Sequence, residues 1–94
     1  MKKALFIGIN DYPTAPLKGC IKDATSISTI LERNGDGSPN FSTRLITSSD
    51  KTITRSLLRE EIEKLFNGDS DIALLYFSGH GFIKSTGGYF VTTD

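Results

Sequence analysis

The only histidine of the chain, His80, lies in the segment Ser78-Gly79-His80-Gly81, directly behind the apolar run 72–77. An imidazole both takes and gives a proton near neutral pH, because its ordinary pKa is about 6.5. The flanking glycines let the backbone approach a substrate closely. If the apolar run is a buried strand of a parallel sheet, the imidazole stands at the carboxyl edge, where ligands bind in open α/β folds. The segment therefore predicts a proton-transfer residue and raises the question of which nucleophile it serves.

The other reactive side chain is Cys20, the one cysteine of the sequence. One histidine and one cysteine in separate segments do not form a zinc-binding pattern, so we expect no metal site in this chain. Glycine motifs for phosphate or dinucleotide binding are missing, and no cofactor is evident. A single cysteine forms no internal disulfide, which favours a reducing, cytoplasmic location.

Composition and length are those of an ordinary small domain. A chain of 94 residues has room for one domain, here residues 1–94, with a modest core. Eleven basic and eleven acidic side chains give a formal net charge of zero, so we expect no nucleic-acid partner. The apolar run 72–77 is far shorter than the roughly 20 residues of a membrane span, so we expect no membrane partner.

Hydrophobic periodicity predicts strands that alternate with helices. The predicted strands are 4–9, 43–47 and 72–77, the predicted helices are 21–34 and 53–66, and a hairpin is expected around Gly87-Gly88. This order indicates an α/β fold with a parallel sheet. Such a sheet would leave a long apolar edge uncovered, so we expect further strands or a partner to complete it. The charged segment 59–64 is interpreted as a solvated helix face.

Three segments of the chain match a known family in that family's own order. They are Ala4-Leu5-Phe6-Ile7-Gly8-Ile9-Asn10-Asp11-Tyr12, Leu17-Lys18-Gly19-Cys20-Ile21-Lys22-Asp23-Ala24 and Tyr76-Phe77-Ser78-Gly79-His80-Gly81. With these segments the chain resembles the caspase-like cysteine peptidases, in particular the metacaspases and the bacterial caspase homologues. The resemblance implies a three-layer caspase-like fold, of which this chain would supply the first half: parallel strands alternating with helices, then a β-hairpin.

The resemblance also implies catalytic roles. His80 corresponds to the family's general acid and base, and the backbone N–H of Gly81 corresponds to a donor that stabilises the oxyanion of a polypeptide substrate. The family's nucleophilic cysteine lies about 50 residues downstream of the histidine, whereas 14 residues follow His80 here. We therefore expect the nucleophile on a complementary C-terminal fragment, and we expect this chain alone to be inactive.

The resemblance implies substrate-binding roles for three further residues. Cys20, Asp23 and Ser78 match positions that contact a basic side chain in metacaspases, which implies cleavage after Arg or Lys. Plainer interpretations stay open: Cys20 could be a small buried hydrophobe, Asp23 a helix-capping residue, and Ser78 a small residue in a tight turn. Tyr12 is expected only to shape its loop. Calcium dependence, known in some metacaspases, would come from residues outside this chain.

Two alternatives belong to other functional classes. The chain could be a non-catalytic interaction module that pairs its open sheet edge with a partner or a second copy. It could also be a flavodoxin-like regulatory domain, in which His80 is an ordinary histidine at a strand end. The uncovered sheet edge argues against the regulatory domain, since that alternative predicts a stable isolated monomer.

Overall fold

The computed structural model describes residues 1–85 and 87–94, with residue 82 described by its backbone alone. Its elements are β1 (Lys2–Gly8), α1 (Cys20–Glu32), β2 (Ser42–Thr47), α2 (Arg55–Phe66), β3 (Ile72–Ser78), β4 (Gly81–Lys84) and β5 (Gly87–Phe90). The three long strands form a parallel sheet in the order β2-β1-β3, and β4 pairs with β5 in an antiparallel hairpin. The predicted α/β class is confirmed.

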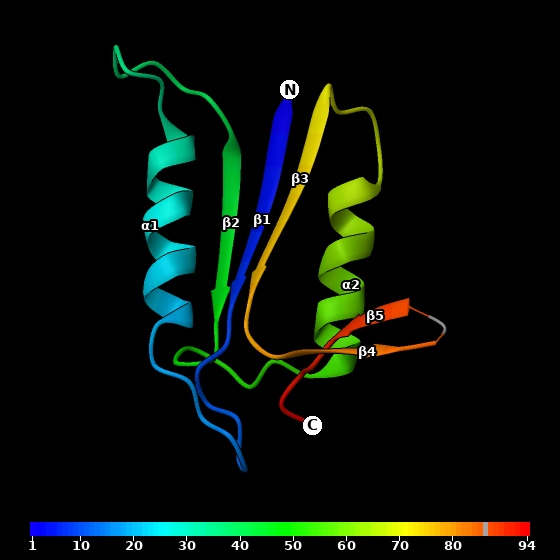
Figure 1. Ribbon diagram of the computed structural model, residues 1–94. Coiled ribbons are helices and arrows are strands. Elements are labelled where there is room, and N and C mark those ends of the chain that lie inside the picture. The colour runs from blue at the N-terminus through cyan, green and yellow to red at the C-terminus, as the bar shows by residue number, and fades with distance from the viewer. Residues whose placement is uncertain (86) are drawn as a thin grey trace.

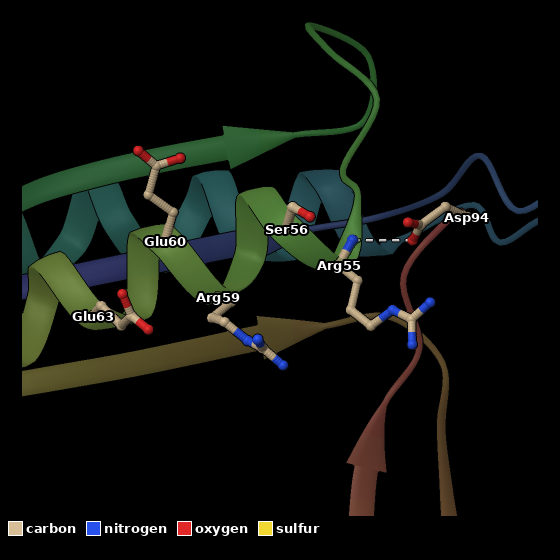
Figure 2. Close-up of a pocket in the computed structure, with 6 residues that line it drawn as sticks. All are labelled: Arg55, Ser56, Arg59, Glu60, Glu63 and Asp94. Atoms are coloured by element: carbon tan, nitrogen blue, oxygen red, sulfur yellow. Dashed lines mark hydrogen bonds between the residues drawn. The ribbon is translucent and has the colours of Figure 1, made fainter.

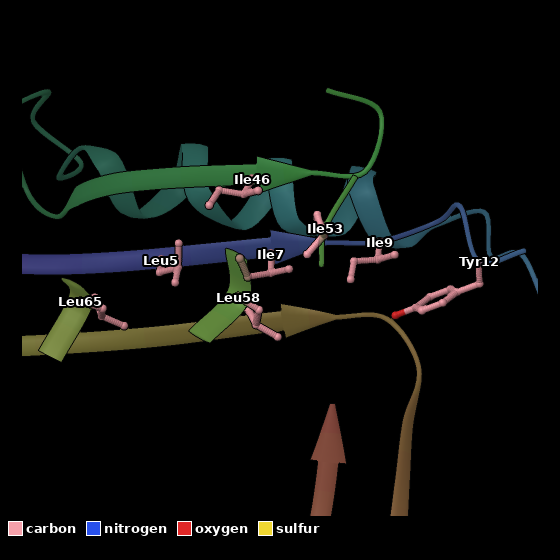
Figure 3. Close-up of a cluster of buried hydrophobic side chains, with 8 residues drawn as sticks. All are labelled: Leu5, Ile7, Ile9, Tyr12, Ile46, Ile53, Leu58 and Leu65. Carbon is pink, nitrogen blue, oxygen red and sulfur yellow. The ribbon is translucent and has the colours of Figure 1, made fainter. Parts of the chain in front are cut away.

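Figure 1 shows the sheet between α1 on one face and α2 on the other, with the hairpin beyond the end of β3. The central strand β1 is buried on both faces, which explains its continuous apolar run. On the α2 face, residues of β1, β2 and α2 form the larger core cluster, which also includes Tyr12 (Figure 3). On the α1 face, Ala4, Phe6 and Ala24 form a smaller cluster. The expected three-layer arrangement is therefore present.

Local signals explain where the helices begin and end. The Thr54 hydroxyl accepts the Leu57 N–H and caps α2, so Ile53 precedes the helix instead of opening it. Helix α1 ends at Glu32, two residues before the predicted end. Arg33 is already extended there and forms an antiparallel bridge with Pro39. Neither helix of the described residues combines the length and hydrophobicity needed to cross a membrane.

The residues after the hairpin return to the start of α2. Thr93 N–H donates to the Ile53 carbonyl oxygen at 3.1 Å, and the Arg55 N–H donates to the Asp94 carboxylate at 3.0 Å. The aromatic rings of Phe77 and Phe90 stack with centroids 4.3 Å apart. These contacts attach the hairpin to β3 and the residues after it to the start of α2, although the two sheets share no ladder in the described part of the chain.

The interpretation of segment 59–64 as a solvated face was wrong at Glu61. Its side chain is only 4% exposed and accepts two hydrogen bonds from Arg44 on β2, Nε–Oε1 at 2.6 Å and Nη2–Oε2 at 2.9 Å. Glu61 lies three residues after Leu58 and four before Leu65, so helical spacing puts it on the buried face of α2. The hydrogen bonds from Arg44 hold the pKa of the Glu61 carboxyl below its usual value.

Replacing Glu61 by Gln should lower the free energy of unfolding at neutral pH by about 1–2 kcal/mol, because charged hydrogen bonds to Arg44 are lost. Since the folded-state pKa of Glu61 is lowered, the stabilisation is complete above the ordinary carboxyl pKa of about 4.3 and is lost as the pH falls through the folded-state value. Urea unfolding at neutral and acidic pH should therefore show a difference that shrinks in acid.

Glu60→Gln is the matched control for this measurement. Glu60 is exposed and lies 3.7 Å from the Lys64 Nζ, so its loss should change stability by less than about 0.5 kcal/mol. Equal stability of the two variants at neutral pH would show that the pair between Arg44 and Glu61 contributes nothing.

Candidate active site

The carboxyl ends of β1 and β3 meet at one edge of the sheet. Their last residues, Gly8 and Ser78, are partners in the parallel register, and the Ile9 N–H donates to the Ser78 carbonyl oxygen at 3.0 Å. The loop 9–19 follows β1, and residues 79–80 follow β3. Because both segments leave the sheet at this edge, their side chains can act together, as ligand-binding residues do in open α/β folds.

The His80 ring is held by the loop 9–19. Its Nε2 lies 2.7 Å from the carbonyl oxygen of Ala15. A carbonyl oxygen only accepts hydrogen bonds, so Nε2 carries the proton and Nδ1 of the neutral ring keeps its lone pair. The rings of Tyr12 and His80 pack with centroids 4.5 Å apart. The structure thus favours the tautomer in which Nδ1 can accept a proton.

Tyr12 holds the backbone at the same position. Its hydroxyl oxygen accepts the His80 backbone N–H at 3.0 Å, and its hydroxyl proton is donated to the Val91 carbonyl oxygen at 2.7 Å. Figure 3 shows the phenol at the end of the core cluster, with its hydroxyl directed toward the loop after β3. The pKa of Tyr12 is raised above its ordinary value, because burial raises it by more than the hydrogen bond from the His80 N–H lowers it. The phenol therefore stays protonated and serves as both donor and acceptor.

Two glycines provide the space for these contacts. A Cβ on Gly79 would lie 2.5 Å from the Tyr12 hydroxyl oxygen and 3.0 Å from the Phe77 ring. A Cβ on Gly8 would lie 2.9 Å from the carbonyl oxygen of Cys20. Any side chain at these two positions would displace the hydroxyl or the start of α1.

Asn10 places Cys20 beside the sheet edge. The Asn10 Oδ1 accepts the backbone N–H groups of Cys20 and Ile21 at 3.0 and 3.3 Å, and the N-cap residue Gly19 supplies no side-chain bond. The cap of α1 is therefore Asn10 rather than the predicted alternative, Asp23. Through the close approach of α1 to β1, Cys20 lies over the end of β1.

The remaining predicted site residues lie at different depths. Ser78 is half-buried and ends β3 beside Gly8, so it shares the edge with Cys20 and His80. Asp23 is exposed in the first turn of α1, and its carboxylate lies alongside Gly19. Within residues 1–85 and 87–94, no hydrogen bond joins Asp23 to Ser78 or to His80. The edge thus gathers His80, Cys20 and Ser78, with Asp23 on the adjoining surface.

The sequence profile of the family described as "Caspase domain" matches residues 1–94, the full length of the chain. The chain belongs to the caspase-domain family. A search of curated proteins and a search of solved structures each gave no match. The family is one of cysteine peptidases, and the match supports a caspase-type peptidase fragment whose α/β fold agrees with the structure.

A hollow of about 410 Å³ lies along α2. Figure 2 shows its lining residues: Arg55, Ser56, Arg59, Glu60, Glu63 and Asp94. The Asp94 carboxylate accepts hydrogen bonds from the Thr92 hydroxyl and from the Arg55 N–H, and these bonds lower its pKa. This hollow contains none of the predicted site residues and mixes charges of both signs. We therefore place the candidate site of this caspase-domain chain at the sheet edge.

The sequence interpretation overlooked three groups of the caspase-domain site. They are the Asn10 carboxamide, the Tyr12 hydroxyl and the Ala15 carbonyl. A polar residue directly after a buried strand was a signal for Asn10, and an aromatic residue in the same loop was a signal for Tyr12. The Ala15 carbonyl had no signal, since every residue carries one. Among the described residues, no group of His, Cys, Asp and Glu is arranged to hold a metal ion.

Replacing Asn10 by Ala should destabilise the caspase-domain chain by about 1 kcal/mol, because two N–H groups at the start of α1 lose their acceptor. Asn10→Asp keeps the accepting oxygen and adds a charge that the helix dipole favours, so it should keep most of the stability. Thermal unfolding of the three proteins measures this. Equal stability of the two variants would mean that the side-chain cap is unimportant.

Proposed function

We propose that this chain forms part of a cysteine endopeptidase that works by acyl transfer, with His80 as the general acid and base. The observation that carries the proposal is the held imidazole: Nε2 is engaged by the Ala15 carbonyl at 2.7 Å, and Nδ1 is the remaining proton acceptor at the sheet edge. The nucleophile would be a cysteine on a complementary segment. Membership of the caspase-domain family supports this reaction type.

The proposed chemistry proceeds in two stages. A cysteine thiol transfers its proton to His80 Nδ1, and the thiolate attacks the substrate carbonyl. The imidazolium then protonates the departing amine, which leaves an acyl-enzyme. His80 next takes a proton from water, whose hydroxide attacks the thioester, and returns that proton to the thiolate as the acid product leaves. The Ala15 carbonyl stabilises the positive charge on the ring in both stages.

The hairpin geometry supports Gly81 as an oxyanion donor. Val91 N–H donates to the His80 carbonyl oxygen at 2.9 Å, so His80 and Val91 form a hydrogen-bonded antiparallel pair. Pairs alternate along such a ladder, and the next pair, Gly81 with Phe90, is a non-hydrogen-bonded one. The Gly81 N–H therefore points away from β5 and is available to a substrate oxygen. A donor of this kind contributes about 3 kcal/mol to transition-state stabilisation.

We further propose that the pocket selects Arg or Lys before the scissile bond. Asp23 would provide the charge, and Cys20 and Ser78 would line the approach. Support comes from the place of Cys20 and Ser78 at the same edge as His80, and from the exposed carboxylate of Asp23 at the start of α1. An exposed carboxylate binds a guanidinium through charged hydrogen bonds.

Replacing His80 by Gln should reduce kcat/KM by at least about 100-fold, because Gln can donate to the Ala15 carbonyl but cannot transfer a proton. The assay uses the chain combined with a segment that carries the downstream cysteine, and a fluorogenic peptide with Arg before the cleaved bond. Lys22→Gln, on the exposed side of α1, is the control and should retain activity. Full activity of the His80→Gln variant would refute the assignment.

Replacing Asp23 by Asn should lower kcat/KM on Arg and Lys peptides by roughly 10- to 100-fold, the value of a lost charged hydrogen bond. Cleavage of a peptide with a neutral residue at that position should change little. Asp69→Asn, at an exposed position between α2 and β3, serves as the control. A uniform loss on all peptides would point to a structural role for Asp23 instead of a role in selection.

A second candidate, a non-catalytic interaction module, is favoured by one observation. Among the described residues β3 pairs only with β1, and Ile72 at the start of β3 is 47% exposed. Apolar surface of this kind beside a sheet edge favours pairing with another chain. Native mass spectrometry separates the candidates: a homodimer of this chain supports the module, and a complex with a cysteine-bearing polypeptide supports the peptidase.

A further inference from the structure

The first pair beyond the hairpin lacks one of its two expected hydrogen bonds. The register of β4 and β5 runs from Lys84–Gly87 to Gly81–Phe90, so His80 and Val91 are the next partners. A regular antiparallel pair at this position exchanges two N–H···O bonds. The Val91 N–H does donate to the His80 carbonyl oxygen at 2.9 Å. The reciprocal bond, from the His80 N–H to the Val91 carbonyl, is absent between these two residues, both of which the structure describes.

The Tyr12 hydroxyl occupies the place of the missing bond. It accepts the His80 N–H at 3.0 Å and donates to the Val91 carbonyl oxygen at 2.7 Å. The Tyr12 hydroxyl thus links the two backbones by a chain of two hydrogen bonds, from the His80 N–H to Tyr12 and from Tyr12 to the Val91 carbonyl. Along this chain each bond polarises the other and strengthens it.

We propose that Tyr12 is a positioning residue, whose hydroxyl is inserted between His80 and Val91 to stop the hairpin at Gly81 and to orient the His80 imidazole toward the Ala15 carbonyl. The effect of Tyr12 on catalysis rests on the proposed peptidase function, whereas its effect on the orientation of the ring does not.

The surroundings of Tyr12 show why the hydroxyl can fill this place. The side chain is 5% exposed and belongs to the larger core cluster, so packing fixes the ring. The hydroxyl sits against Gly79, where a Cβ would approach it to 2.5 Å. A phenol is suited to the position because it donates one hydrogen bond and accepts others, as a bridging water would.

Without the hydroxyl, the backbone of His80 has two ways to respond. Its N–H could stay without a partner, or His80 and Val91 could close into a regular pair that extends β4 by one residue. Closing the pair moves the His80 Cα relative to the loop 9–19, and an N–H without a partner leaves the backbone free to shift in the same way. The contact between Nε2 and the Ala15 carbonyl would then lengthen or break, and the ring would no longer be confined to one tautomer.

The first experiment uses the fact that the chain has a single histidine, so that its imidazole nitrogen signals need no assignment. Long-range ¹H–¹⁵N NMR at a pH where the ring is neutral should show the Nε2–H tautomer in the unaltered chain. Tyr12→Phe should give a mixture of tautomers. Tyr76→Phe, which removes a hydroxyl from β3, is the matched control and should keep the single tautomer. An unchanged tautomer in the Tyr12→Phe variant would overturn the proposal.

A second measurement covers the case in which Tyr12→Phe does not fold. In the unaltered chain, the Tyr12 hydroxyl proton should exchange slowly with water and show a nuclear Overhauser contact with the His80 amide proton. Gly79→Ala should abolish that contact, because its methyl group displaces the hydroxyl. A rapidly exchanging hydroxyl proton in the unaltered chain would overturn the proposal.

The kinetic experiment uses the chain combined with a cysteine-bearing segment. Tyr12→Phe should lower kcat about 10- to 100-fold, as a misplaced catalytic group does, and leave KM for an Arg peptide unchanged. A loss confined to KM would overturn the positioning role. If the unaltered assembly is inactive, the proposed function fails, and the tautomer measurement alone decides the role of Tyr12.

Discussion

The burial of β1 on both faces is the constraint on which the rest of the structure depends. If β1 ended between α1 and α2, its backbone N–H and C=O groups would be buried among apolar side chains without partners. The chain therefore becomes polar only where it leaves the edge of the sheet. There the Ile9 N–H donates to the Ser78 carbonyl oxygen and the Asn10 N–H donates to the Ser48 hydroxyl. The Asn10 side chain in turn accepts the first N–H groups of α1. The candidate site lies where these hydrogen bonds are formed.

Most of the fold was predictable because it follows from periodic burial. The apolar runs of β1 and β3 and the stripe of α2 each belong to an element with a fully or partly buried face, and the order of elements gave the parallel sheet. The errors arose where a particular contact was not visible in the sequence pattern. The bridge between Arg33 and Pro39 shortens α1, and Arg44 on β2 pairs with Glu61 on the buried face of α2. The periodicity of α2 already put Glu61 on that face, but nothing in the segment 59–64 shows its partner 17 positions away.

The candidate site was predictable only in part, for a related reason. His80 was visible because it stands between two glycines directly behind an apolar run and within a segment that matches the family, and Cys20, Asp23 and Ser78 were visible through the same resemblance. The groups that orient His80 were harder to find from the sequence. The Tyr12 hydroxyl acts on His80 across 68 positions, and Ala15 acts through a backbone carbonyl that carries no residue-specific signal. The sequence shows which reactive side chains are present, whereas the orientation of these side chains depends on tertiary contacts.

The loop 9–19 has a mechanical consequence of its own. It holds the imidazole through Ala15 and Tyr12, and it holds the start of α1 through Asn10. The Asn10 carbonyl also accepts the N–H groups of Tyr12 and Leu17, which closes the loop on itself. The same loop therefore positions both the proton-transfer group and the residues proposed to recognise the substrate. If the loop 9–19 moved as a rigid body, His80 and the start of α1 would move with it. The distance between the proton-transfer group and the substrate-recognition residues would then stay the same.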